Sequence, residues 1–193
     1  RIGDWANEHA ESMASLGIQE LADNKIIESC YPLHPLTTLV LPELCSRIGQ
    51  NERTLFTFLA GPDERSASSF LARTELPSSG PLPSLGLHDA FEFFVAKGVP
   101  SSMPPGSASR LVEITTRLRD VTGLTEEQDQ LALSIGLLNI VSTSGAVRAS
   151  RPVLRLVAPD ADKAINELEE MGVITYREFA DEYRVWQGSD TDL

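Results

Sequence analysis

Cysteine is scarce in this sequence, and the cysteines that occur form no recognisable motif. There are two, Cys30 and Cys45, and no further cysteine stands near either of them. Zinc sites and redox pairs need closely spaced cysteines or histidines, so neither kind of site is indicated. We expect two reduced, partly buried thiols, as in a cytoplasmic protein.

Positive charge is also in short supply. Lysine and arginine number 16 against 28 aspartates and glutamates, which gives a formal net charge of −12 at pH 7. Affinity for nucleic acid depends on cations that neutralise phosphates, so a chain this acidic has no general attraction for DNA or RNA. Any contact with nucleic acid would need a local basic patch.

Long apolar runs are missing as well. No stretch of about 18 apolar residues occurs, and no signal-peptide pattern is present. The sequence therefore predicts neither a membrane span nor secretion, and we expect a cytoplasmic location. The 193 residues, of which 41% are hydrophobic, suffice for one large domain or two small ones.

The motifs of common catalytic sites are absent from the sequence. It has no G-x-x-x-x-G-K-[ST] phosphate loop, no G-x-G-x-x-G dinucleotide motif and no G-x-S-x-G nucleophile elbow. Its three histidines, His9, His34 and His88, lie far apart in the sequence. We therefore expect no self-contained enzyme. The chain also begins at Arg1, within a helical pattern, which we interpret as a fragment of a longer protein.

Helical periodicity dominates the first half of the chain. The spacing of apolar residues predicts helices over 2–22, 35–48, 52–60, 63–73 and 87–97, with a short strand or loop at 24–30. Gly17 weakens the first helix, and Pro42 predicts a kink or break in the second. Residues 75–86 and 98–107, rich in Pro, Gly and Ser, predict loops or linkers. We assign residues 1–104 to a helical, lid-like subdomain.

The second half has the order of a winged helix-turn-helix. The predicted helices cover 108–122, 125–142, 151–157 and 160–171. Thr125, followed three residues later by Gln128, has the pattern of a capping box. Alternating residues at 173–177 and 183–186 predict a β-hairpin. The expected fold class is mainly α, a helical lid bundle followed by a winged helix over residues 105–193.

The charge of the predicted recognition helix, residues 160–171, argues against DNA binding. It carries five acidic residues and a single basic one, Lys163. Base reading needs Arg, Lys, Asn or Gln, and Asn166 alone fits that role well. A modest cluster of arginines precedes the helix and either contacts phosphates or forms a solvated edge: Arg148, Arg151 and Arg155. The pattern favours an interaction or regulatory module.

Two polar residues stand at the predicted starts of helices. His34, between Pro32 and Pro35, either caps backbone groups or donates a hydrogen bond to a nucleotide. Arg53 follows Asn51, a good N-cap, and a cation there opposes the helix dipole. Its side chain either pairs with a nearby carboxylate or reaches a phosphate held by another domain. The sequence leaves both pairs of alternatives open.

Three stretches together resemble a known family. They are CYPLHPLTTLVLPELCSRIGQNERTLFTFL, SIGLLNIVSTSGAVRAS and YREFADEYRVWQGSDTDL. They are similar to the region after the ATPase core in large bacterial AAA+ or STAND-like P-loop ATPases. That family shares the layout of origin-recognition-type ATPases, and many members belong to phage-defence or mobile-element operons. The resemblance spans about residues 25–193 and implies a helical lid followed by a winged helix.

The resemblance also implies roles for individual residues. Tyr31, Pro32, His34 and Pro35 match a lid start that lies against the adenine, and Arg53 matches a sensor arginine that reaches the nucleotide phosphates. The implied cofactor is ATP with Mg, bound by an N-terminal P-loop domain of the same parent chain. The phosphate loop, the acidic metal-binding motif and the first sensor are absent from this sequence. ATP binding is therefore implied for the parent protein only.

Three functions remain open at this point. The first is a regulatory lid and winged helix that couples nucleotide state to domain movement, and it requires His34 and Arg53 to share one exposed face. The second is a DNA-binding module, in which Arg177 and Arg184 would extend the arginine cluster into a basic stripe. The third is a nucleotide-independent scaffold whose acidic helix meets a basic protein partner.

Overall fold

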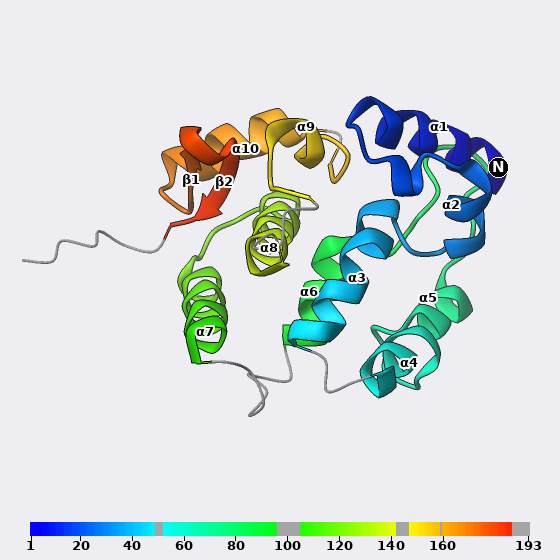
Figure 1. Ribbon diagram of the computed structural model, residues 1–193, viewed down its shortest axis with the longest axis horizontal. Helices are drawn as coiled ribbons and strands as arrows, with labels where there is room; N and C mark the ends of the chain where they lie inside the picture. The colour runs from blue at the N-terminus through cyan, green and yellow to red at the C-terminus, as the bar shows by residue number, and fades with distance from the viewer. Residues whose placement is uncertain (49–51, 96–104, 142–146, 159, 187–193) are drawn as a thin grey trace, which may run out of the picture. The chain divides into compact units, whose positions relative to one another are not determined.

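The computed structural model describes residues 1–48, 52–95, 105–141, 147–158 and 160–186, and for 52–53 and 105–107 the backbone alone. Within these residues the chain forms ten α-helices and a C-terminal two-stranded antiparallel hairpin (Figure 1). The predicted fold class, mainly α with this hairpin, is confirmed. The chain divides into two compact units, residues 1–93 and 94–193. The boundary expected at residue 104 lies outside the described residues.

Unit 1 is built from short helices that follow one another closely. They are α1 (Ile2–Ser15), a 3-10 turn (Gln19–Leu21), α2 (Asn24–Cys30), α3 (Pro35–Arg47), α4 (Glu52–Ala60), α5 (Ala67–Arg73) and α6 (Leu87–Val95). Pro42 lies inside α3 without interrupting it. The bounds predicted for α3 and α4 are correct to within two residues, as is the start of α6, whose expected end at residue 97 lies outside the described residues.

Three of the predictions for unit 1 are wrong, each for a local reason. The helix expected over 63–73 begins only at Ala67, because the Ser66 hydroxyl accepts a hydrogen bond from the Ser69 N–H at 3.2 Å and caps the helix there. Helix α1 ends at Ser15 because Gly17, at φ +75°, takes the left-handed conformation that closes a helix. The N–H of Ile18 then bonds to the Met13 carbonyl at 2.9 Å. Residues 24–30 form a helix, not a strand or loop, because the Asp23 carboxylate accepts a hydrogen bond from the Lys25 N–H at 2.8 Å.

The segment between α5 and α6, rich in proline and glycine, is fastened to the start of α3. Leu85 accepts a hydrogen bond from the His34 N–H at 2.9 Å and donates its own N–H to the Pro32 carbonyl at 2.8 Å. The Tyr31 hydroxyl donates to the Pro83 carbonyl at 3.0 Å. This segment is therefore a long ordered loop within unit 1 and does not connect the two units.

Apolar side chains from every part of unit 1 form its core. Phe58 of α4 packs on Phe93 of α6, with ring centroids 4.9 Å apart. The largest fully buried side chains of the unit are Phe58, Phe93, Met13, Ile27, Leu36, Leu44, Leu85 and Leu87. Burial of each such side chain contributes about 1.5–3 kcal/mol, so the long loop stabilises the unit through Leu85.

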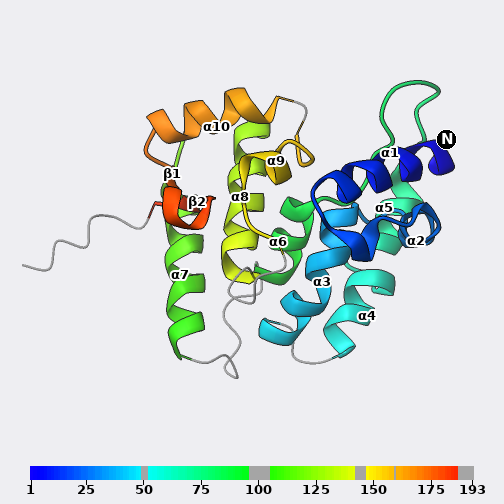
Figure 2. The ribbon, with the colours of Figure 1, turned by 45° about the horizontal axis from the view of Figure 1, so that its top comes forward.

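Unit 2 contains the helices and the hairpin that the sequence predicts to form a winged helix. Its elements are α7 (Pro105–Asp120), α8 (Glu126–Val141), α9 (Arg151–Leu154), α10 (Ala161–Glu170), β1 (Ile174–Arg177), a 3-10 turn (Glu178–Ala180) and β2 (Glu182–Val185). Helices α7 and α8 run side by side, and α10 crosses one end of α8 (Figure 2). In the hairpin, Ile174 faces Val185 and Tyr176 faces Tyr183. The order from α8 to β2 is that of a winged helix.

Caps fix the start of α8 and the end of α10. The predicted capping box is confirmed: the Thr125 N–H donates to Gln128 Oε1 at 2.9 Å, and the Gln128 N–H donates to Thr125 Oγ1 at 3.3 Å. Helix α10 ends at Gly172, which has φ +65°. The N–H of the next residue, Val173, bonds back to the Leu168 carbonyl at 2.9 Å, and the chain turns into β1.

One buried amide attaches the hairpin to α8. Asn139 is 1% exposed, and its side chain donates to the Tyr183 carbonyl at 2.9 Å and accepts from the Val185 N–H at 3.0 Å. On the same edge of β2, the Tyr183 N–H donates to the Ala149 carbonyl at 2.8 Å. The opposite edge pairs with β1, so both backbone edges of β2 are hydrogen-bonded, as buried peptide groups require.

No helix among the described residues is long and apolar enough to cross a membrane.

Replacing Asn139 should detach the hairpin from α8. Asn139→Ala leaves a buried carbonyl and a buried N–H of β2 without partners, so we expect a loss of about 2 kcal/mol or more in the free energy of unfolding. Urea denaturation followed by Trp186 fluorescence, in a Trp5→Phe background, measures it.

Ser134→Ala is the matched control. Ser134 is also buried in α8, but its hydroxyl donates only to the Gln130 carbonyl of its own helix. Its loss should cost less than about 1 kcal/mol. Equal costs for the two variants would contradict the role of Asn139.

Candidate functional site

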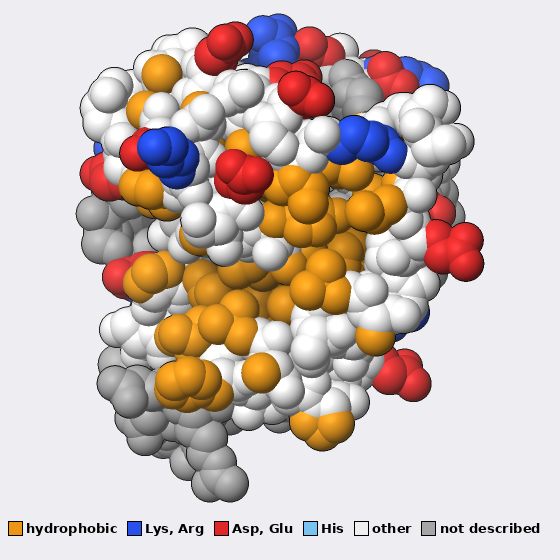
Figure 3. Space-filling model, turned by 90° about the vertical axis from the view of Figure 1, so that its right-hand side faces the viewer, with side chains coloured by type: hydrophobic (Ala, Val, Ile, Leu, Met, Phe, Trp, Pro, Cys, Tyr) orange, Lys and Arg blue, Asp and Glu red, His pale blue; other side chains and the backbone are white. Residues whose placement is uncertain are grey.

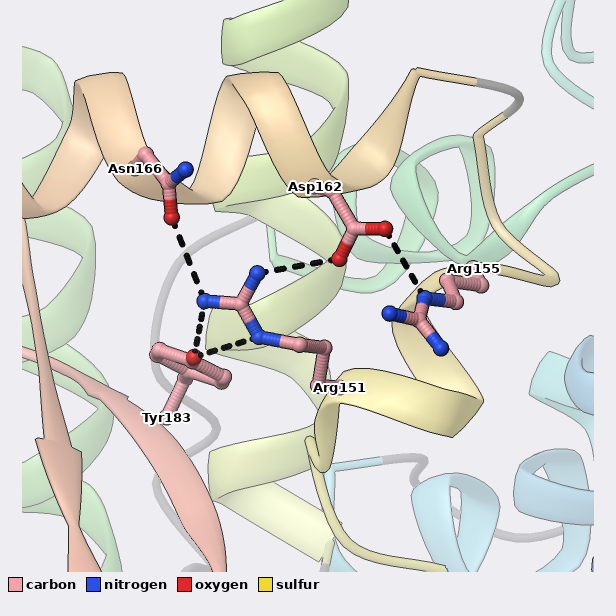
Figure 4. Close-up of polar contacts among 5 residues, drawn as sticks. All are labelled: Arg151, Arg155, Asp162, Asn166 and Tyr183. Carbon is pink, nitrogen blue, oxygen red and sulfur yellow. Dashed lines mark hydrogen bonds and ion pairs between the residues drawn. The ribbon is translucent and has the colours of Figure 1, made fainter.

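Arg151, at the start of α9, connects three elements of the winged helix (Figure 4). Its Nε and Nη2 both donate to the hydroxyl of Tyr183 on β2, at 3.0 and 2.7 Å. Its Nη1 donates to Asp162 Oδ1 at 2.9 Å, and Nη2 also donates to Asn166 Oδ1 at 3.2 Å. The guanidinium carbon lies 5.5 Å from the centre of the Tyr183 ring. One side chain thus bonds α9 to α10 and to the hairpin.

Asp162 completes this network by holding a second arginine. Its Oδ2 accepts a hydrogen bond from Arg155 Nε at 2.9 Å, while Oδ1 is occupied by Arg151. The hydrogen bonds from Arg155 and Arg151 lower the pKa of the Asp162 carboxyl below its usual range. Desolvation opposes the charged form of Arg151, but the bonds to Asp162 and Tyr183 outweigh it and raise the pKa of that guanidinium.

Two of the other three arginines of the predicted basic stripe, Arg148 and Arg184, also bond to the protein. Arg148 Nη1 donates to the Ala180 carbonyl at 2.9 Å, which holds the turn of the hairpin. Arg184 pairs with Glu182, a carboxylate that is almost completely buried. Arg177 is exposed on β1. The structure therefore brings Arg151 and Arg155 together, but around the exposed Asp162 carboxylate, which occupies the guanidinium groups that a phosphate would use.

Helix α10 itself presents carboxylates to its surroundings. Glu167 accepts a hydrogen bond from Gln128 of α8 at 2.7 Å, and Lys163 lies 3.8 Å from it. Glu169 and Glu170 stand in the last turn, where the helix dipole disfavours negative charge, and no basic residue of α10 stands in that turn. Asn166, the expected base reader, accepts a hydrogen bond from Arg151. This face is poorly suited to a DNA groove.

His34 caps the start of α3. Its Nδ1 accepts a hydrogen bond from the Leu36 N–H at 3.2 Å, so the imidazole carries its proton on Nε2 in this arrangement. The ring also packs edge-on against His9, with centroids 5.1 Å apart. The Trp5 ring lies tilted against His9, with centroids 4.5 Å apart. The capping alternative raised by the sequence is thus what the geometry shows.

The residues matched to a nucleotide lid are placed in different ways. His34 is 9% exposed and Pro32 is buried, whereas the Tyr31 ring is half-buried and packs against Trp5 at 5.5 Å. Burial raises the pKa of the Tyr31 hydroxyl. The backbone of Arg53 belongs to α4, but its side chain lies outside the described residues, as does Asn51. Because His34 is buried, it cannot form the exposed face that the first hypothesis requires it to share with Arg53.

The described part of the chain holds no group of three or more His, Cys, Asp or Glu side chains that could bind a metal ion. Cys30 and Cys45 are free and partly buried, and burial raises the pKa of the Cys45 thiol. A raised thiol pKa lowers the fraction of reactive thiolate at neutral pH. Cys45 therefore lacks the setting of a nucleophile.

Unit 1 exposes a broad apolar area. On the face that carries α1, α2, α4 and α5, hydrophobic side chains gather in the middle, with charged groups around them (Figure 3). The large hydrophobic side chains of this unit that are exposed include Ile26, Phe56, Leu71 and Leu76. Apolar areas of this kind are typical of surfaces that contact other proteins.

No family model, curated protein or solved structure matches this chain.

Sequence reasoning identified the arginines but missed their partners. In the sequence, Asp162 is one of five acidic residues of the predicted helix 160–171, and Tyr183 is a residue of the predicted strand 183–186. Arg151 and Asp162 are eleven positions apart and belong to different helices, so no i,i+3 or i,i+4 spacing marks the pair. The excess of acid over base on α10 was the one signal available.

Removing the His34 side chain should destabilise unit 1. His34→Ala loses the cap of α3, which costs about 1 kcal/mol, and also the packing against His9. His34→Asn keeps a capping oxygen and should recover part of the loss. Urea denaturation followed by Trp5 fluorescence measures both variants. Wild-type stability in His34→Ala would show that the cap contributes nothing.

The Asp162 network makes the stability of unit 2 depend on pH. The pKa of the Asp162 carboxyl is lowered in the folded state. Its contribution to the free energy of unfolding is therefore fully present above the usual pKa of about 3.9 and is lost as the pH falls through the lowered pKa. Asp162→Asn should therefore be less stable than the wild type at pH 7, and the two should converge on acidification. Urea midpoints measured from pH 7 down to the lowest pH at which the chain stays folded test this.

Asp160→Asn is the control for that comparison. Asp160 is the N-cap residue of α10, but its side chain makes no capping hydrogen bond. Its offset from the wild type should stay small across the range. A gap between wild type and Asp162→Asn that is the same at every pH would contradict the role assigned to the Asp162 carboxylate.

Proposed function

We propose that this chain is a regulatory lid and winged-helix segment of a multidomain bacterial P-loop ATPase, and that its winged helix contacts protein and not DNA. It couples the nucleotide state of the ATPase to domain movement, in a defence or mobile-element system. Contact with protein and not DNA is supported mainly by the Asp162 carboxylate, which binds both Arg151 and Arg155. The first part rests on the sequence resemblance and on the order of helical unit and winged helix.

Charge supports contact with protein. A DNA-binding winged helix needs donors and cations on its recognition helix and on the residues that flank it. In this structure α10 is acidic, Asn166 accepts from Arg151, and four arginines of the expected stripe have internal partners. A partner with basic groups would be favoured at the carboxylates Glu169 and Glu170 at the end of α10.

The apolar area on unit 1 supports the same conclusion. Exposed Phe56, Leu71 and Leu76 are available for contact with another domain or subunit. In the proposal, the N-terminal P-loop domain of the same parent chain is one such partner, and ATP with Mg binds there. Arg53 is the residue of this chain that would reach its phosphates, and a cytoplasmic location follows from that role.

The burial of His34 reduces the number of residues that we propose to contact the nucleotide directly. A capping histidine can position the start of α3, and with it Tyr31, but it presents little surface to a ligand. We therefore propose Arg53 as the main contact, with Tyr31 and Pro32 as lesser ones and His34 as a positioning residue.

ATP hydrolysis by the parent protein tests the proposal. Arg53→Ala should lower kcat by about 10²-fold, the cost of losing one preorganised cation at a developing phosphate charge. Arg65→Ala, which removes the same charge from an ion pair with Glu92 in unit 1, should leave it nearly unchanged. Addition of duplex DNA should not alter the rate. Wild-type hydrolysis in Arg53→Ala would contradict the nucleotide role, and stimulation by DNA would contradict protein-only contact.

A further inference from the structure

We infer that Asp162 is the specificity-determining residue of this winged helix: its carboxylate occupies the place where a nucleic-acid phosphate would bind between Arg151 and Arg155. This inference rests on the proposed function, because it names the group that excludes DNA from the same surface. It predicts that loss of one negative charge, at this position alone, exposes a latent affinity for duplex DNA.

The geometry of the two guanidinium groups supports this. Arg151 and Arg155 lie one turn apart at the start and the end of α9, and both point to α10 (Figure 4). They approach the two oxygens of one carboxylate at the same distance, 2.9 Å. A phosphate group offers the same kind of acceptor, an oxyanion that binds guanidinium groups through charge-assisted hydrogen bonds. The Asp162 carboxylate thus accepts the hydrogen bonds that the two arginines could otherwise donate to a phosphate.

Arg151 and Arg148 have other hydrogen bonds that hold them in place when the Asp162 carboxylate is removed. Arg151 retains two hydrogen bonds to the Tyr183 hydroxyl and one to Asn166. Arg148 remains bonded to the Ala180 carbonyl at the turn of the hairpin. Substitution of Asp162 should therefore free the Nη1 of Arg151 and the Nε of Arg155 while the position of Arg151 is maintained.

The surrounding surface then becomes more positive. The residues that precede and open α10 are Arg148, Arg151, Arg155, Asp160, Asp162 and Lys163. In the wild type, one carboxylate of this group is shared by two arginines. Without it, Arg155 loses its carboxylate partner and Arg151 keeps only the neutral partners Tyr183 and Asn166, while Lys163 stays 3.8 Å from Glu167. Arginines released from a carboxylate in this way provide the salt-dependent term of DNA binding.

Asp160 provides a matched control. It is exposed, lies two positions before Asp162 at the same end of α10, and its side chain makes no capping hydrogen bond. Asp160→Asn and Asp162→Asn remove the same single negative charge. Net charge alone therefore predicts equal effects, whereas release of the two arginines predicts an effect in Asp162→Asn only.

The experiment is a titration of a labelled mixed-sequence DNA duplex with the full chain, followed by fluorescence anisotropy at about 50 mM salt, where the electrostatic contribution is large. The wild type and Asp160→Asn should show no binding or equally weak binding. Asp162→Asn should bind about tenfold more tightly, since one charge-assisted contact corresponds to roughly a factor of ten. Each freed phosphate contact should also steepen the dependence of log affinity on log salt by about 0.9.

Further variants separate the possible outcomes. Asp162→Asn combined with Arg155→Ala should lose the gain, and Asp162→Ala is the second variant if asparagine disturbs the fold, which circular dichroism monitors. If folded Asp162→Asn and Asp162→Ala bind no better than Asp160→Asn, the inference is overturned while the proposed function stands. If the wild type already binds the duplex with a steep salt dependence, the protein-only function is overturned.

Discussion

The surface around α9 and α10 depends on the charge pairing of Arg151 with Asp162. Because Arg151 also donates to Tyr183, this one guanidinium fixes α9, α10 and the hairpin relative to one another. Asp162 extends the pairing to Arg155, so one carboxylate offsets part of the charge of the two arginines nearest to α10. Both guanidinium groups bind the protein itself.

The same principle, polar groups satisfied within the unit, recurs throughout the molecule. Asn139 satisfies both a carbonyl and an N–H of β2, and Arg117 donates to the Gly172 carbonyl where α10 ends. In unit 1, His34 caps α3 while its own N–H bonds to Leu85. What remains exposed is acidic on α10 and apolar on unit 1, and both are better suited to protein partners than to nucleic acid.

The sequence predicted local features well and long-range contacts poorly. The capping box of Thr125 and Gln128 and the alternation of the hairpin depend on residues that are neighbours in the chain, and both are confirmed. Residues 24–30 were misjudged because the Asp23 cap outweighed a short ambiguous pattern. The contacts of Asp162 and Asn139 join segments that only the tertiary fold brings together, so no spacing rule could reveal them. The nucleotide role of Arg53 stays a prediction.

The most direct test of this account is the solvent exchange of the arginine Nε–H protons, measured by ¹⁵N-edited NMR. Arg151 Nε donates to Tyr183 and Arg155 Nε donates to Asp162, whereas Arg119, at the end of α7, is exposed. The account predicts resolved, slowly exchanging signals for Arg151 and Arg155, and faster exchange at Arg119. Exchange at Arg151 and Arg155 as fast as at Arg119 would show that the two arginines are available to external phosphates, and would contradict the central claim.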